Sequence, residues 1–207
     1  KGVALAGSLS VLEEEGYQPS NVAGASAGAI ISTLIAAGYS AAEIGDIIAN
    51  QDFNLFMDKG WEDTLPKVVG VPLSILKDQG IFEGNYFLGR MKELLEAKGI
   101  HTFKDLIIPE FADQPKYKYK VQVVASDITE RRMLVLPRDA ESLGIEPDNL
   151  GVAEAVRMSM SFPIFFEPYR IKDPAGKEHV IVDGGLLSNF PVWLFDSKGK
   201  PEWPTFG

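Results

Sequence analysis

The 207-residue sequence contains no cysteine and only 2 histidines. The lack of cysteine excludes disulfide bonds and thiolate metal sites, and it fits a reducing compartment. The scarcity of histidine leaves few candidates for a histidine general base. No run of apolar residues approaches the roughly 20 that a transmembrane helix needs, and the sequence has no internal repeat or low-complexity stretch. With no cysteine and few histidines, serine and carboxylate side chains are the main candidates for catalysis.

Positive charge is also in short supply. The 20 Lys and Arg residues against 29 Asp and Glu residues give a formal net charge of −9. This balance argues against nucleic acid as a partner and against purely electrostatic adhesion to anionic lipid. Hydrophobic residues make up 45% of the chain and charged residues 24%. A chain of this length and composition can bury a full core, so we expect a single domain over residues 1–207.

A G-x-S-x-G sequence lies between a short apolar run and an apolar helical pattern. It consists of Gly24, Ala25, Ser26, Ala27 and Gly28. Residues 21–25 are typical of a strand and residues 30–35 have helical spacing, so the motif predicts a nucleophile elbow, a sharp turn from strand to helix. The glycines remove side chains that would block the bend and lift the serine hydroxyl toward solvent. The alternative for a lone motif of this kind is a tight packing site between strand and helix.

Ser26 is therefore the candidate nucleophile. The helix after it directs its N-terminal N–H groups and the positive end of its dipole toward negative charge that develops near the serine oxygen. The backbone N–H of Ala27 is the first candidate donor of an oxyanion hole.

A serine hydroxyl needs a base, and three residues are candidates. His101 follows a helix and its terminating glycine, so we expect it in a surface loop. His179 lies in the same predicted strand as Asp183 and about 13 Å from it, at about 3.3 Å per residue, so it cannot bridge Ser26 and Asp183. Asp183 ends an apolar strand and precedes Gly184 and Gly185. Alone it would indicate an Asp-Gly turn, but together with an elbow it is the better candidate for a base that acts without histidine.

These residues resemble the catalytic Ser-Asp dyad of patatin-like phospholipases. The two central segments are Gly24-Ala-Ser-Ala-Gly28 and Asp183-Gly-Gly185. Lys1-Gly2 resembles the end of the family's glycine-rich oxyanion loop, G-G-G-x-[KR]-G. Further segments resemble the family in the same order along the chain, namely Ala125 to Thr129, Val156 to Pro163, Phe166 to Pro168 and Ser188 to Pro191.

The resemblance implies an α/β fold, a three-layer α/β/α sandwich with a central, mostly parallel sheet. It implies that residues 1–207 form one catalytic domain that lacks the first strand and the glycine-rich loop, which the family has before Lys1. Gly2 and Ala27 are then the oxyanion-hole residues that can be named in this chain. The resemblance implies no cofactor and no metal.

The implied activity is that of a lipid acyl hydrolase, of phospholipase A or lysophospholipase type, with an acyl-enzyme intermediate. The partner is a phospholipid or another acyl-ester lipid, and peripheral contact with a membrane or lipid aggregate is compatible with it. A cytoplasmic or membrane-peripheral location is favoured, with secretion left open, and the oligomeric state is unknown. Two alternatives remain: a lipid-binding or regulatory module that has lost catalysis, and a triad esterase whose histidine lies beyond Gly207.

Two further segments carry expectations. Residues 51–82 are apolar without sustained periodicity, and they fit an insertion packed on the core better than a flap over acyl chains. A helix is expected from Glu83 to Ala97. Lys116-Tyr-Lys-Tyr-Lys120 predicts a protected edge strand rather than a basic patch for phosphate groups. Asp127 is expected to form an Asx-type turn rather than to act in catalysis.

Overall fold

The computed structural model describes residues 2–50, 73–163, 166–197 and 199–207, and the backbone alone over residues 73–83. The α-helices are α1 (Gly2–Glu14), α2 (Ala27–Ala36), α3 (Ala41–Asn50), α6 (Leu73–Glu96) and α7 (Val152–Ser159). The strands are β1 (Val22–Ala25), β2 (Val121–Asp127), β3 (Arg132–Leu136), β4 (Tyr169–Lys172) and β5 (Glu178–Asp183). Short 3₁₀ helices are η1 (Phe103–Leu106), η2 (Pro109–Phe111), η3 (Ala140–Leu143), η4 (Pro147–Asn149), η5 (Gly184–Leu186) and η6 (Pro191–Phe195).

The strands form one mixed sheet. Of the described strands, β1 and β2 run parallel, whereas β2 is antiparallel to both β3 and β5, and β4 is antiparallel to β5. The α/β class agrees with the expectation, but the expectation of a mostly parallel sheet is wrong for these strands. The reason is local, because short turns over residues 128–131 and 173–177 join β2 to β3 and β4 to β5, and short turns connect antiparallel neighbours.

One edge of β2 carries both β1 and β5. β3 pairs with residues 123–127 of β2, β1 pairs with residues 121–124, and β5 pairs with residues 125–127. Because a strand residue has one neighbour on each edge, β1 and β5 both lie opposite β3. Ala25 at the end of β1 pairs with Val124, and Asp183 at the end of β5 pairs with Ala125. The two strands therefore run toward each other, and their C-terminal ends meet.

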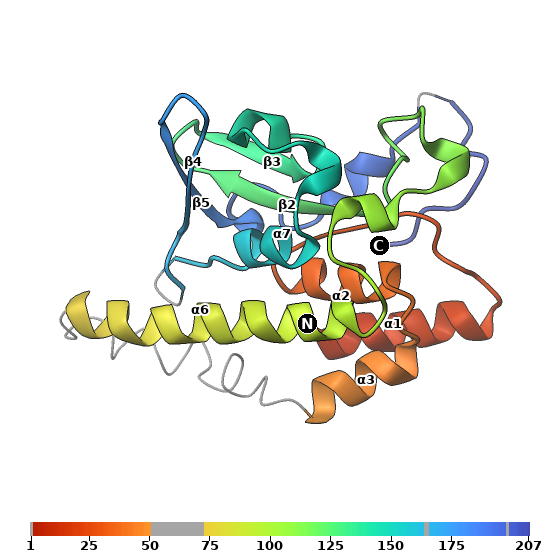
Figure 1. Cartoon of the computed structure of the whole chain (residues 1–207). Coiled ribbons are helices and arrows are strands. Elements are labelled where there is room, and N and C mark those ends of the chain that lie inside the picture. The colour runs from red at the N-terminus through yellow and green to blue at the C-terminus, as the bar shows by residue number, and fades with distance from the viewer. Residues whose placement is uncertain (1, 51–72, 164–165, 198) are drawn as a thin grey trace.

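Helices cover one face of this sheet, as Figure 1 shows for α1, α2, α3, α6 and α7. The sequence of α2 contains no charged residue, and Ile30, Ile31 and Leu34 are at most 5% exposed. A helix that is apolar on most sides is buried between neighbours, and here α1 packs on it from outside while the sheet lies inside. Each buried large aliphatic side chain contributes about 1.5–3 kcal/mol. This core fixes the direction in which α2 leaves the sheet.

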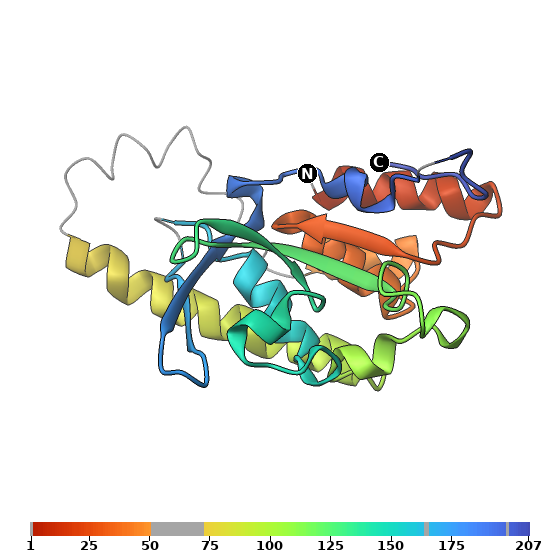
Figure 2. The same cartoon turned by 90° about the horizontal axis from the view of Figure 1, so that it is seen from above.

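On the opposite face of the sheet, η6 packs against the strands. Its Leu194 packs with Ala25, Val124 and Val135, whose side chains alternate along the strands with those of the main core. Figure 2 shows the C-terminal segment that follows η6. In this segment the ring of Phe206 meets the ring of Tyr17, in the loop after α1, edge-on with centroids 5.0 Å apart. The third layer of the expected sandwich is thus represented by η6.

Local sequence signals set the start of α3. The Ser40 N–H donates to Glu43 Oε2 at 2.7 Å, and the Glu43 N–H donates to Ser40 Oγ at 3.2 Å. This reciprocal pair is a capping box, which satisfies two N–H groups that the first turn of a helix leaves without intrahelical acceptors.

The helix α6 departs from its expected bounds, because it begins at Leu73 and not at Glu83. The expectation that residues 51–82 form a packed insertion rather than a flap concerns mainly residues 51–72, and these lie outside the described residues. Within the described part of the chain, no helix is both long and apolar enough to cross a bilayer.

The segment Lys116–Lys120, expected as an edge strand, is a turn region with one isolated bridge, from Tyr119 to Ile107. Lys118 and Tyr119 both donate to the carboxylate of Asp148. These two hydrogen bonds lower the pKa of Asp148, with that from Lys118 the larger cause, and burial raises the pKa of Tyr119 to about 12. Because the segment is not a strand, its lysines do not form the common face that a strand would give them.

Candidate active site

The predicted elbow joins β1 directly to α2. β1 ends at Ala25, α2 begins at Ala27, and Ser26 between them has φ 55° and ψ −129°. A positive φ at a residue with a side chain costs on the order of 1–3 kcal/mol and persists only where surrounding contacts hold it. Gly24 permits the close start of the helix, because a Cβ at that position would lie 2.2 Å from the carbonyl carbon and oxygen of Gly28.

The two glycines of the motif are not equivalent. A Cβ built on Gly28 meets nothing within 4 Å. Gly24 is therefore required by packing, whereas Gly28 is not.

The structure brings Ser26 and Asp183 together. The Ser26 hydroxyl donates to Asp183 Oδ2, with 2.6 Å between the two oxygens. Asp183 is 2% exposed, and its Oδ1 accepts the N–H of Gly185 at 2.6 Å. One carboxylate oxygen is thus held by the backbone while the other faces the serine, so the carboxylate has a fixed orientation toward the hydroxyl.

The glycines after Asp183 allow this turn to lie against the sheet. A Cβ on Gly184 would lie 2.0 Å from the carbonyl oxygen of Val124, and a Cβ on Gly185 would lie 2.9 Å from Asp183 Oδ1. Any larger residue at position 184 would collide with the β2 backbone. Both glycines therefore place the carboxylate rather than contribute chemistry.

The two expected oxyanion-hole residues lie in different settings. Ala27 is the first residue of α2, where backbone N–H groups have no intrahelical acceptor and the helix dipole is positive. Gly2 is the first residue of α1, and a Cβ there would be 3.8 Å from a methyl of Ile48 and 4.0 Å from one of Ile31. These contacts are with core side chains and not with the elbow. Ala27 is thus the better placed donor.

The end of α7 and the two residues after it contact both members of the pair, which the sequence did not reveal. Ser159 Oγ accepts the backbone N–H of Ser26 at 2.8 Å, and Met160 Sδ lies 3.8 Å from Ser26 Oγ. The carbonyl oxygen of Ser161 accepts the backbone N–H of Asp183 at 3.0 Å. The only sequence signal was the family-like segment Val156 to Pro163, which assigns no role to single residues.

A buried arginine anchors this turn. Arg157 is 8% exposed and donates to Ser161 Oγ at 2.6 Å and to the carbonyl oxygen of Glu167 at 3.1 Å. Burial lowers the pKa of its guanidinium. The Ser161 hydroxyl in turn donates to the Arg157 carbonyl oxygen at 2.9 Å. The hydrogen bonds of the buried Arg157 therefore fix the position of the residues at the end of α7.

The hydrogen bonds described for the two histidines are made to residues outside the dyad. His101 is exposed, in agreement with the expected surface loop, and its backbone N–H donates to Asp105. His179 is buried, and its Nδ1 lies 2.7 Å from Asp127 Oδ2. Asp127 Oδ1 accepts the backbone N–H of Thr129 at 2.9 Å, so the expected Asx-type turn is present. The sequence did not show that Asp127 also binds the histidine of β5.

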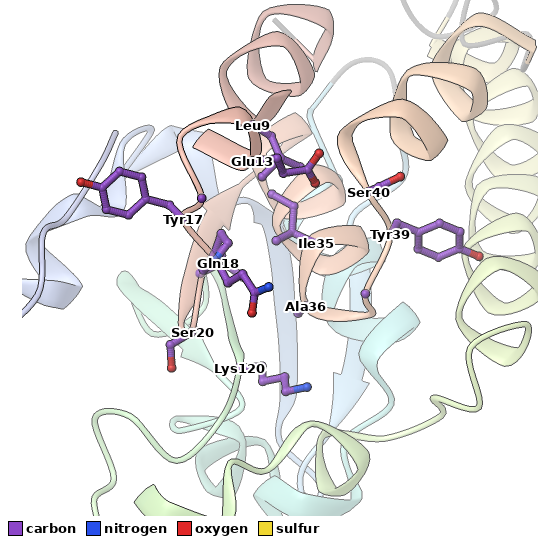
Figure 3. Close-up of a pocket in the computed structure, with 14 residues that line it drawn as sticks. Leu9, Glu13, Tyr17, Gln18, Ser20, Ile35, Ala36, Tyr39, Ser40 and Lys120 are labelled. Carbon is purple, nitrogen blue, oxygen red and sulfur yellow. The ribbon is translucent and has the colours of Figure 1, made fainter. Parts of the chain in front are cut away.

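A pocket of about 540 Å³ lies at the opposite end of β1 from the elbow (Figure 3). Its lining includes Val22 at the start of β1, Ser20 just before it, Gly38 just after α2, and the charged residues Glu13 and Lys120. No residue of the elbow or of the Asp183 turn lines it. Among the described residues, no group of three or more His, Cys, Asp or Glu side chains is arranged to hold a metal ion.

Large apolar side chains are exposed directly after Asp183. Leu186, Leu187 and Phe190 are 60%, 55% and 61% exposed, and Trp193 is 38% exposed. They follow the carboxylate in η5, in η6 and in the turn between them. An apolar surface so close in sequence to the dyad suits a substrate with an apolar part.

Comparison with known proteins adds the family. Residues 1–196 match the model of the family described as patatin-like phospholipase. The chain is 42% identical over 200 residues to the uncharacterized protein YqhO of Bacillus subtilis (strain 168), a match that covers 97% of this chain and 65% of YqhO. It is 24% identical over 198 residues to the uncharacterized protein R571 of Acanthamoeba polyphaga mimivirus, covering 94% of this chain and 58% of R571. The chain thus spans less than two thirds of the length of these curated relatives.

A solved structure shares the fold. VipD from Legionella pneumophila superposes with a TM-score of 0.53 at 17% sequence identity, covering 95% of this chain and 46% of VipD. At this identity the similarity concerns the fold alone, and it agrees with the open α/β arrangement described above.

Proposed function

We propose that this chain, which belongs to the patatin-like phospholipase family, hydrolyses acyl esters of lipids through a dyad of Ser26 and Asp183. Membership of the family supports a lipid hydrolase at this coarse level. The observation that carries the finer proposal is the 2.6 Å hydrogen bond from Ser26 Oγ to the buried carboxylate of Asp183. We also propose that residues 1–207 belong to one catalytic domain.

In the proposed reaction, Asp183 accepts the proton of Ser26 as its Oγ attacks the ester carbonyl. The carbonyl oxygen becomes an oxyanion, which the Ala27 N–H and the positive end of α2 stabilise. The intermediate collapses, the bond to the leaving alcohol or lysolipid breaks, and Asp183 returns the proton to that leaving oxygen. A water molecule, deprotonated by Asp183, then attacks the acyl-serine, and the acid leaves as Ser26 regains its proton.

Burial of the base supports this role. Asp183 is 2% exposed, so water competes little for the oxygen that faces Ser26, and electrostatic interactions are stronger where solvent is excluded. The fixed N–H of Gly185 on Oδ1 keeps Oδ2 directed at the serine through both proton transfers. The arrangement does not require a histidine.

The proposed substrate is a phospholipid, a lysophospholipid or another acyl-ester lipid. The exposed Leu186, Leu187 and Phe190 beside the Asp183 turn support an apolar substrate and peripheral contact with a membrane or lipid aggregate.

A serine-reactive fluorophosphonate tests the proposal together with hydrolysis of an aryl ester and of phospholipid vesicles. We expect the probe to label Ser26, and Ser26→Ala to lose both labelling and turnover. Lipid binding by the parent protein without labelling or turnover would instead identify a lipid-binding module that has lost catalysis.

A further inference from the structure

The parallel hydrogen-bond pattern between β1 and β2 is interrupted at the nucleophile. The Val22 N–H donates to the carbonyl oxygen of Lys120 at 2.8 Å. In a parallel pair such bonds recur every second residue on both strands, so the same series would pair the Ser26 N–H with the carbonyl oxygen of Val124. A side chain occupies that place instead.

The side chain is that of Ser159, at the end of α7. Its Oγ accepts the Ser26 N–H at 2.8 Å and donates its own hydrogen to the Val124 carbonyl oxygen at 2.6 Å. Ser159 is 0% exposed, so no water is available to replace either bond. The hydroxyl therefore bridges the two groups that would otherwise bond directly as the next step of the ladder.

This bridge affects the backbone at Ser26. The inserted oxygen increases the spacing between the two chains directly after Ala25, the last residue of β1. It also satisfies the Ser26 N–H in a backbone conformation, φ 55°, that is unfavourable for a residue with a side chain. Because the Ser26 N–H is already bound to Ser159, oxyanion donors come from Ala27 onward and not from the nucleophile itself.

The residues that follow Ser159 directly also hold the base. The Ser161 carbonyl oxygen binds the N–H of Asp183, so residues 159–161 contact the backbone of both dyad members. The 2.6 Å separation of the reacting oxygens thus depends on a third segment of the chain.

We propose that Ser159 is a positioning residue of the reaction, whose hydroxyl takes the place of a β1–β2 ladder bond and holds Ser26 in its elbow conformation. This inference rests on the proposed dyad for its kinetic consequence. Its structural consequence, protection of the Ser26 amide by Ser159, does not depend on activity.

The kinetic test is Ser159→Ala, with activity expressed per folded protein from thermal unfolding. A displacement of about 1 Å at a reacting atom costs about 10²-fold in rate, so we expect kcat on an aryl ester to fall about 10²-fold with KM nearly unchanged. The matched control is Ser126→Ala, because Ser126 Oγ is also buried and has no hydrogen-bond partner among the described residues. We expect that control to keep kcat within about twofold of the parent.

Amide hydrogen exchange provides the test that needs no turnover. In Ser159→Ala the Ser26 amide should exchange about tenfold faster than in the parent, since a bond in a buried site is lost. An unchanged Ser26 exchange rate, or a kcat within twofold of the parent in folded Ser159→Ala, overturns the proposal. If the parent and Ser26→Ala turn over substrate equally, the proposed dyad is wrong, and the exchange result still decides the role of Ser159.

Discussion

The Asp183→Asn substitution removes the proposed base and keeps the shape of the side chain. The amide can still accept the Gly185 N–H through one oxygen, as Asp183 Oδ1 does at 2.6 Å. At the other position, 2.6 Å from Ser26 Oγ, it offers an amide group that is far too weak a base to take the serine proton. The substitution therefore separates the chemistry of the carboxylate from its packing.

The magnitude follows from the loss of general-base catalysis. A positioned base contributes about 10²–10⁴ in rate, which corresponds to about 3–5 kcal/mol of activation free energy. Neither histidine can take over, because His179 is bonded to Asp127 and His101 lies on the surface. We expect kcat to fall about 10²–10⁴-fold, and the free energy of unfolding to change by less than about 2 kcal/mol.

The assay compares kcat and KM on a soluble aryl ester with the thermal unfolding of each variant. The matched control is Asp127→Asn, because Asp127 is an equally buried aspartate that also accepts backbone N–H groups and also ends a strand. Asp127→Asn should lower stability and leave kcat per folded protein within about twofold of the parent. A folded Asp183→Asn with kcat within tenfold of the parent would refute the reasoning, as would an equal loss of kcat in the control.

Other substitutions test the elbow and the histidine pair. Gly24→Ala places a methyl group 2.2 Å from the Gly28 backbone, so it should lower the unfolding free energy by about 3 kcal/mol and reduce activity. Gly28→Ala places its methyl group in open space and should change the unfolding free energy by less than about 1 kcal/mol. Equal unfolding midpoints for the two variants would contradict the packing explanation. His179→Ala leaves the buried Asp127 carboxylate without its 2.7 Å partner and should lower the unfolding free energy by about 3 kcal/mol, while His101→Ala should be neutral. Both histidine variants should keep kcat per folded protein, and loss of turnover in a folded His179→Ala would reopen the choice of base.

Part of the fold and part of the site could be predicted because their determinants are local. Gly24 to Gly28 encode the strand, turn and helix within a few residues, and the Ser40 and Glu43 capping box needs only its own turn. Asp183 could be singled out because a carboxylate at the end of an apolar strand and before two glycines is presented at a sheet rim. These features fix backbone angles and exposure without reference to distant residues.

The sheet could not be predicted in the same way. The parallel expectation came from the fold resemblance, whereas β5 is antiparallel to both β2 and β4. Strand direction and register depend on which edges pair, and a strand's own residues carry little information about its partner.

Sequence alone thus determined the nucleophile turn, the base-bearing turn and the family, because short motifs in a fixed order carry all three. Only the tertiary structure decided that β1 and β5 approach end to end on one edge of β2, which brings Ser26 and Asp183 to 2.6 Å. It also decided that Ser159 stands between Ser26 and Val124, and that His179 is bound by Asp127 away from the site. Each of these contacts joins residues far apart in the chain, so each depends on the packing of the whole domain rather than on local preference.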